Sequence, residues 1–313
     1  MKNFQQMNSG KELHSLKIIV DSNYIGHVSR YSTGGLTHND SPVGVIFGFL
    51  NQILNIGNHF QTNEFYFAWD SKHSYRRQIC PEYKKHRKKT LTSEEKEELK
   101  QSFQQFDRLR RDILPSIGFK NQLSQRGCEA DDIIAMFVKQ ADLSDILDEG
   151  VTIISADEDL YQLLQRKVSM YTPAKKSLMT DMGFKAFYGI EPKDWVKVKA
   201  LAGCSSDNVK GIAGVGEKTA IKYLVGELKE GKKLRDILEQ QEEMYFKNYP
   251  LVKLPIKETK KLKITDNELG AKAELEFDRV CTDLGFNSFI ETNKLSRWEE
   301  FFRGDFNPFM EFN

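Results

Sequence analysis

The chain has 313 residues, of which 39% are hydrophobic and 29% are charged, and its formal net charge is +1. This length allows one large hydrophobic core together with a smaller unit. The near-zero net charge gives no sign of a nucleic-acid partner, and no run is long and apolar enough to cross a membrane. The polar segment 1–17 lacks the apolar stretch of a signal peptide, so we expect a cytoplasmic protein with no membrane partner.

The cysteines and histidines do not form a recognisable metal-binding pattern. Cys80, Cys128, Cys204 and Cys281 are widely separated, and no two of the six histidines have a paired helical spacing. Zinc sites of the common kinds need closely spaced pairs of such ligands. We therefore expect reduced thiols and ordinary histidines.

Short apolar runs predict strands at 17–20, 65–69, 151–155 and 168–171. Helical periodicity lies between them: at 45–56, from Thr92 to Ile113, and from Ala130 onward. Thr92 and Glu95 have the spacing of a capping box, which marks the start of the second helix. Strands that alternate with helices predict an α/β domain on a largely parallel sheet. From about Trp195 the pattern becomes helical with glycine-rich turns, at 196–201, 211–216 and 218–228, which predicts a smaller helical unit.

Acidic side chains follow three of the expected strands. Asp21 follows the first strand, Asp70 the second, and Asp157 and Asp159 the third. Ligands of open parallel sheets lie beyond the carboxyl ends of the strands. We therefore expect these acids to converge on one crevice.

A second acidic group, formed by Glu129, Asp131 and Asp132, opens the third helix. Taken singly, each acid has an ordinary structural role, such as a helix N-cap at Asp157. Together they would repel one another unless cations neutralise them. Oxygen ligands favour Mg²⁺ or Mn²⁺ over zinc, and two such ions roughly 4 Å apart activate a water and stabilise a leaving oxygen. The sequence thus predicts metal-assisted hydrolysis of a phosphodiester without a covalent protein nucleophile.

Five motifs occur in the order found in the 5′-nuclease (flap endonuclease) family. They are the segments 20–23 (VDSN), 68–70 (AWD), 127–132 (GCEADD), 155–160 (SADEDL) and 206–208 (SDN). The chain resembles the 5′→3′ exonuclease domain of bacterial DNA polymerase I and the free-standing bacteriophage exonucleases, over about residues 17–228. The resemblance implies an α/β fold in which a mostly parallel central sheet is flanked by helices, as in a PIN-like 5′-nuclease core. It also implies a basic helical arch at about 72–112 and a helix–three-turn–helix subdomain.

The resemblance also implies how the chain is divided into domains and which activity it has. We expect the nuclease core and arch at 14–190, and the duplex-binding subdomain with the C-terminal region at 191–313. The implied enzyme is a structure-specific 5′ nuclease that acts as a 5′→3′ exonuclease and flap endonuclease in primer or flap removal. Branched, nicked or 5′-flap DNA is the implied substrate, and RNA of RNA–DNA hybrids is a further one. A monomer in a bacterial cytoplasm or phage-infected cell is expected.

The resemblance implies two metal sites that use Mg²⁺, with Mn²⁺ able to substitute. The first site is implied around Asp21, Asp70, Glu129 and Asp131. The second is implied around Asp131, Asp157, Asp159 and Asp207, with Asp132 nearby. Relatives often have an aspartate where this chain has Cys204, so we expect a weaker second site and a higher metal requirement.

The basic segment 72–89 contains residues 76–87, which resemble the family's arch. Its cations can neutralise phosphates and its tyrosines can stack on bases, although a lone charge run is more often a solvated loop. The resemblance places Lys84 and Arg87 near the scissile phosphate as catalytic residues. The expected DNA contacts of the arch are Arg76, Arg77, Tyr83, Lys84, Lys85 and Arg87.

The glycine-rich segment 211–220 resembles the helix–three-turn–helix signature. Its glycines allow close backbone approach to a phosphate, and the following helix presents N-terminal amides. We expect Gly214, Gly216 and Lys218 to contact duplex DNA, and the family likeness implies a K⁺ ion there. Contacts of this kind recognise DNA shape rather than sequence.

The C-terminal region is rich in aromatic residues, and two interpretations remain open for it. Trp298, Phe301, Phe302 and Phe306, followed by Pro308, Phe309 and Phe312, could dock on a sliding clamp or single-strand-binding protein, or could pack onto the body of the protein. Two other functions also remain open for the whole chain. One is a metal-dependent ribonuclease, which would need neither the arch nor the 211–220 module. The other is a DNA-junction-binding protein with impaired catalysis, which only Cys204 supports.

Overall fold

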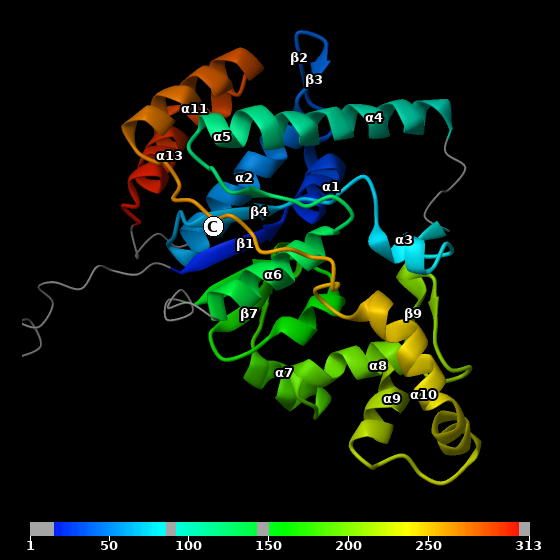
Figure 1. Cartoon of the computed structure of the whole chain (residues 1–313). Helices are drawn as coiled ribbons and strands as arrows, with labels where there is room; N and C mark the ends of the chain where they lie inside the picture. The colour runs from blue at the N-terminus through cyan, green and yellow to red at the C-terminus, as the bar shows by residue number, and fades with distance from the viewer. Residues whose placement is uncertain (1–15, 86–91, 143–149, 307–313) are drawn as a thin grey trace, which may run out of the picture.

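The computed structural model describes residues 16–85, 92–142 and 150–306. A six-stranded sheet lies at its centre, in the order β5–β4–β1–β6–β7–β8. These strands are β1 (Lys17–Asp21), β4 (Phe65–Ala68), β5 (Gln122–Leu123), β6 (Val151–Ile154), β7 (Val168–Thr172) and β8 (Ser177–Met179). All neighbouring pairs are parallel except β7 with β8. The expected mostly parallel sheet flanked by helices is confirmed (Figure 1).

The two faces of the sheet carry separate hydrophobic clusters, because successive side chains of a strand point to opposite faces. Ile18 and Val20 of β1 join one cluster with α2 (Gly44–Phe60), whereas Ile19 joins the other with α6 (Ala130–Asp142). The other α-helices of the described residues before 190 are α1 (Ser22–Thr33), α3 (Tyr75–Ile79), α4 (Ser93–Arg108), α5 (Leu114–Ser116) and α7 (Asp181–Tyr188). The short hairpin β2 (Thr37–His38) and β3 (Ser41–Pro42) connects α1 to α2. Among the described residues, no helix is both long and apolar enough for a membrane span.

The expected helix from Thr92 to Ile113 forms almost as predicted. The Thr92 hydroxyl accepts a hydrogen bond from the Glu95 N–H at 3.1 Å, and the Thr92 N–H donates to Glu95 Oε2 at 2.7 Å. Helix α4 continues through a π-helical turn, Leu109–Ile113, into α5. In Figure 1, α4 extends from the body of the protein toward the side where α3 lies. Residues 86–91, including Arg87, lie outside the described residues.

The smaller helical unit begins at α8 (Trp195–Ala202), close to the predicted segment. A short antiparallel pair, β9 (Gly203–Cys204) and β10 (Val209–Lys210), encloses the turn Ser205–Asp207. Helix α9 (Glu217–Leu224) and the long helix α10 (Lys232–Val252) follow, and both pack against α8. This unit therefore holds Cys204 and Asp207 on a hairpin beside the nuclease core.

The last helices are α11 (Ala271–Leu284), α12 (Asn287–Ile290) and α13 (Thr292–Arg303). Trp298 and Phe301 have no solvent exposure, Phe302 is buried, and Phe306 packs partly buried against the same cluster as β1 and α2. For this part of the aromatic tail, packing onto the body is the correct interpretation. Pro308, Phe309 and Phe312 lie outside the described residues.

Candidate metal centre

Carboxylates from separate elements meet at the carboxyl edge of the parallel strands. Asp21 ends β1, and its Oδ1 accepts a hydrogen bond from the Tyr24 N–H at 3.0 Å. Its Oδ2 accepts from the Ser155 hydroxyl, just beyond β6, at 2.9 Å. Asp70 follows β4, and its Oδ1 accepts from the Ala130 N–H at the start of α6 at 2.8 Å. These bonds join the ends of β1, β4 and β6 and the first turn of α6 into one crevice.

The pKa values of three carboxylates at this edge are raised, first by burial and then by the charges of neighbouring carboxylates. Burial, with the charges of Asp70 and Asp157, raises the pKa of Asp21 from 3.8 to about 7. Burial and the charges of Asp157 and Asp21 raise the pKa of Asp131 well above its usual value. Burial, followed by the charge of Asp159, raises the pKa of Asp157. An edge at which ionisation is this unfavourable is suited to bound cations, which would compensate the negative charges.

The raised pKa of Asp21 gives a pH-dependent stability prediction. Between pH 3.8 and about 7 the folded state holds more protons on Asp21 than the unfolded state does, so the free energy of unfolding falls as pH rises through this window. We expect Asp21→Asn to stabilise the metal-free protein at pH 8 by on the order of 1 kcal/mol, since Asn carries no charge but loses one hydrogen bond. Thermal unfolding in EDTA between pH 4 and 8 measures this. A difference between variant and wild type that does not change with pH would contradict the prediction.

A second part of the centre contains Tyr83 and Lys84. The Tyr83 hydroxyl lies 3.0 Å from Glu129 Oε2 and 2.9 Å from Asp207 Oδ2. Lys84 Nζ donates to Glu129 Oε2 at 2.6 Å and lies 3.7 Å from Asp207 Oδ2. Burial alone would lower the pKa of Lys84, but Glu129 and Asp207 raise it well above its usual value. Lys84 is therefore a fixed positive charge among the acids.

The expected stacking role of Tyr83 is corrected by its position. Its side chain is 2% exposed and packs in a small cluster with Val196, Ala200 and Cys204. A base could not reach the ring in this conformation. Its contacts indicate instead that it positions Glu129 and Asp207.

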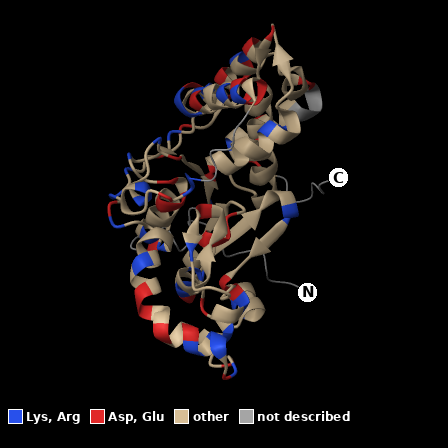
Figure 2. Cartoon of the chain, turned by 90° about the vertical axis from the view of Figure 1, so that its right-hand side faces the viewer, with Lys and Arg blue, Asp and Glu red and all other residues tan. Residues whose placement is uncertain are grey.

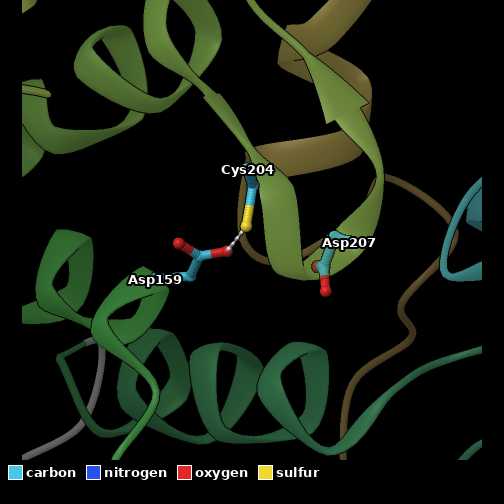
Figure 3. A group of neighbouring side chains, drawn as sticks. All are labelled: Asp159, Cys204 and Asp207. Atoms are coloured by element: carbon cyan, nitrogen blue, oxygen red, sulfur yellow. Dashed lines mark hydrogen bonds between the residues drawn. The ribbon is translucent and has the colours of Figure 1, made fainter. Parts of the chain in front are cut away.

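The third part of the centre is formed by Asp159, Cys204 and Asp207, with one ligand atom from each within 4.8 Å of the others (Figure 3). Asp159 and Cys204 approach each other in Figure 3, where the Cys204 thiol donates to Asp159 Oδ2 at 3.9 Å. The thiol also lies 3.0 Å from the Ser206 hydroxyl oxygen. These donors fit a divalent cation, although one of them is sulfur.

Lys199 is a charged residue of this centre that the sequence did not reveal. It is 7% exposed, and its Nζ lies 2.9 Å from Asp159 Oδ1 and 2.9 Å from Glu217 Oε1. Burial alone would lower the pKa of Lys199, but Asp159 and Glu217 raise it well above its usual value. No local motif marks it, because it lies on α8 beside the ordinary surface lysine Lys197 and its partners are distant in the chain.

The expected roles of Asp132 and Arg76 are also corrected. Asp132 has no exposure, and its two oxygens accept from the Arg76 guanidinium at 2.6 and 2.7 Å. Arg76 is 2% exposed and also donates to the Leu251 carbonyl at 2.8 Å. Asp131 and Asp132 diverge because consecutive helical residues point about 100° apart. The Arg76–Asp132 pair therefore joins α3 to α6 and α10, and in this structure both side chains are turned away from solvent.

A groove of about 1150 Å³ runs from the crevice along α4. Asp70 and Trp69 line it at the sheet, and Phe103 and Phe106 line it on α4. Its cationic lining residues are Lys72, Lys96, Lys100, Arg110, Arg111 and Arg126. Figure 2 views the molecule from the right-hand side of Figure 1 and shows acidic segments near the middle, with basic and acidic segments mixed on the helices above and below. Carboxylates that could hold metal ions, beside a groove lined by cations, suit a metal-dependent nuclease.

The other expected DNA contacts among the described residues lie at the surface of the protein. Arg77 and Lys85 are exposed on the α3 side of the crevice. Gly214 has φ 74°, and a side chain at Gly214 or Gly216 would meet nothing within 4 Å, so the backbone there is open to a ligand. Lys218 is exposed in the first turn of α9.

Comparison with known proteins supports a metal-dependent nuclease. A family model described as the N-terminal resolvase-like domain of 5′-3′ exonucleases matches residues 17–199. The 5′-3′ exonuclease of Buchnera aphidicola subsp. Schizaphis graminum is 30% identical over 291 residues, which are 91% of this chain and 96% of that protein. The chain belongs to the 5′-3′ exonuclease family.

Solved structures share the fold at lower identity. A T5 5′-exonuclease with bound zinc ions has a TM-score of 0.64 and 23% identity, covering 76% of this chain and 89% of its own. The bacteriophage T5 D15 flap endonuclease in complex with DNA and metal ions has a TM-score of 0.59 and 23% identity, covering 90% and 98%. The expected 5′-nuclease fold is confirmed.

Proposed function

We propose that this nuclease cuts branched, nicked or 5′-flap DNA, as a 5′→3′ exonuclease and flap endonuclease. The observation that carries the proposal is that Asp70, one of the carboxylates of the crevice, also lines the cationic groove along α4. A single strand in the groove would have its phosphates neutralised by the lysines and arginines while a phosphodiester lies beside Asp70. The complex of the T5 flap endonuclease with DNA and metal ions supports the same use of this fold.

We propose two divalent ions, Mg²⁺ by preference with Mn²⁺ able to substitute, because most of the ligands are carboxylates. The first ion would be held by Asp21, Asp70, Glu129 and Asp131, and the second by Asp131, Asp157, Asp159 and Asp207. When bound, the ions activate a water and stabilise the leaving oxygen. The raised pKa values of Asp21, Asp131 and Asp157 support the proposal, since cations would relieve that repulsion.

The protein residues would orient the scissile phosphate. Lys84 is the proposed catalytic cation, and its bond to Glu129 holds its charge beside the proposed first metal site. Arg87 is proposed for the same role from the part of the arch outside the described residues. Arg77 and Lys85 would contact phosphates, and the open backbone at Gly214 and Gly216, with Lys218, would hold the duplex together with a K⁺ ion.

The wider role is proposed from the family alone. It comprises primer or flap removal in replication or repair, cutting of RNA in RNA–DNA hybrids, and a monomeric state in a bacterial cytoplasm or phage-infected cell. The proposed units are residues 14–190 for catalysis and 191–313 for duplex binding and the C-terminal region. A clamp or single-strand-binding protein would have to engage residues beyond Phe306, because the aromatic side chains of α13 are buried.

Cleavage of a 5′-labelled flap DNA in Mg²⁺, in Mn²⁺ and in EDTA tests the proposal. We expect products released near the branch with either metal and none in EDTA, and a steep loss of binding with salt but little effect of base order. Tight flap binding without cutting in either metal would replace the proposal with a junction-binding protein of impaired catalysis. Equal cutting of single-stranded RNA and flap DNA would favour a ribonuclease.

A further inference from the structure

The donor set at Asp159, Cys204 and Asp207 differs chemically from the rest of the centre. The other proposed ligands are carboxylates, whereas here a thiol lies between two of them. Cys204 is 7% exposed and Asp207 8% exposed, so the donors are shielded from bulk water. Mg²⁺ is a hard ion that keeps several waters and binds sulfur poorly, whereas Zn²⁺ and Cd²⁺ accept sulfur and oxygen together.

The distances suit a small tetrahedral ion. In a zinc site with Zn–S about 2.3 Å and Zn–O about 2.0 Å, the sulfur and oxygen atoms lie ~3.5 Å apart. Cys204 Sγ lies 3.9 Å from Asp159 Oδ2, so an inward shift of a few tenths of an ångström completes that edge of the tetrahedron. A carboxylate oxygen of Asp207, the third donor, lies within 4.8 Å of the ligand atoms of Asp159 and Cys204.

Neighbouring side chains also orient the two carboxylates of this donor set. Lys199 bonds Asp159 at Oδ1, which leaves Oδ2 as the oxygen that faces Cys204. The hydroxyl of Tyr83 and the ammonium of Lys84 lie at Asp207 Oδ2 and fix that carboxylate beside the thiol. The ligands are thus held by contacts outside the donor set, as outer partners hold the ligands of metal sites.

We propose that Asp159, Cys204 and Asp207 form a site for a thiophilic divalent cation of the Zn²⁺ class, which it binds more tightly than Mg²⁺. The inference rests on the proposed function: it adds Cys204 to the ligands of the proposed second site and gives a Zn²⁺-class ion the higher affinity there, while Mg²⁺ remains the ion proposed for cleavage. On binding, a sulfur–metal bond forms and the thiol proton passes to solvent. A water or a substrate phosphate oxygen supplies the fourth ligand.

Cd²⁺ titration of the whole protein in excess Mg²⁺ tests the site directly. Cadmium bound to a thiolate absorbs in the ultraviolet, so the readout does not depend on cleavage. We expect one saturating Cd²⁺ per chain in wild type, no band in Cys204→Ser, and roughly tenfold or greater loss of Cd²⁺ affinity in both Cys204→Ser and Cys204→Asp. Cys204→Asp is a second variant without the thiol, in case the serine variant does not fold, and it has the acid that relatives often have at this position.

Two matched controls separate this site from two of the three other thiols. Cys80→Ser removes a half-buried thiol of the α3 side, and Cys281→Ala removes a thiol of the opposite core. Both should keep the band and the affinity of wild type. A band that survives in Cys204→Ser, or equal Cd²⁺ affinities in wild type and Cys204→Asp, would overturn the inference. If wild type cleaves flap DNA in Mg²⁺ but shows no Cd²⁺–thiolate band, the inference is wrong and the proposed function stands. If the band forms but no flap DNA is cleaved, the proposed function is wrong and the cation site stands.

Discussion

Asp131→Asn should lower Mg²⁺-dependent flap cleavage by on the order of a thousandfold while the protein stays folded. Asp131 is the carboxylate that both proposed metal sites share, and its pKa is raised by burial and by the charges of Asp157 and Asp21. The amide cannot supply the negative charge that two cations require, so the loss should appear in the cleavage rate at every practical Mg²⁺ concentration. Single-turnover cleavage of a labelled flap, with circular dichroism to confirm folding, measures the effect.

The neighbouring Asp132→Asn is the matched control and should behave in the opposite way. It breaks a fully buried pair with Arg76, which should cost about 3 kcal/mol of unfolding free energy. The fraction that remains folded should still cleave within about tenfold of wild type, because Asp132 has no part in the proposed metal sites. The assignment of the two residues would have to be exchanged if Asp132→Asn were stable but inactive and Asp131→Asn were active.

The contrast between these two neighbours shows how far the sequence predicts the site. The acids that follow β1, β4 and β6 were placed correctly at one edge, because a buried apolar run fixes each strand and the next residues must emerge at its carboxyl end. In the first turn of α6 the sequence offers adjacent acids and no local rule to separate them. The side chain of Asp132 turns inward because Arg76, distant in sequence, packs against it.

The same limit applies to the basic segment. Its charge is evident from composition, but the burial of Arg76 depends on its contact with Leu251 of α10, and that of Tyr83 on its contact with Asp207 in the turn between β9 and β10. Only long-range packing decides which cations of such a run turn inward.

The fold was predictable where periodicity or capping is strong and not elsewhere. The Thr92 capping box marked the start of α4 correctly. The two-residue strand β5 and the three-residue strand β8 are too short for an alternating pattern to appear. Helix α10 is rich in charge and contains Pro250, so its local sequence argues against a long helix, and packing on α8 overrides this.

Lys84→Ala should reduce the single-turnover rate of flap cleavage by about a hundredfold, with less than about threefold change in duplex affinity. Its side chain is 15% exposed and its ammonium lies 2.6 Å from Glu129 Oε2, so we expect it to act on a phosphate at the crevice and to add little to duplex binding. Lys85, the next residue, is 64% exposed and pairs with Glu82 at 2.8 Å. Lys85→Ala is therefore the matched control, and should weaken binding slightly in a salt-dependent way without changing the rate on bound DNA.

Both variants should be compared at saturating metal, because removal of the Lys84 charge also changes the repulsion between Glu129 and Asp207. If Lys84→Ala and Lys85→Ala lose rate and affinity in the same proportion, Lys84 only contacts DNA and has no catalytic role. If Lys84→Ala alone loses rate while its DNA affinity is kept, the fixed charge inside the centre stabilises the transition state and the exposed charge beside it does not.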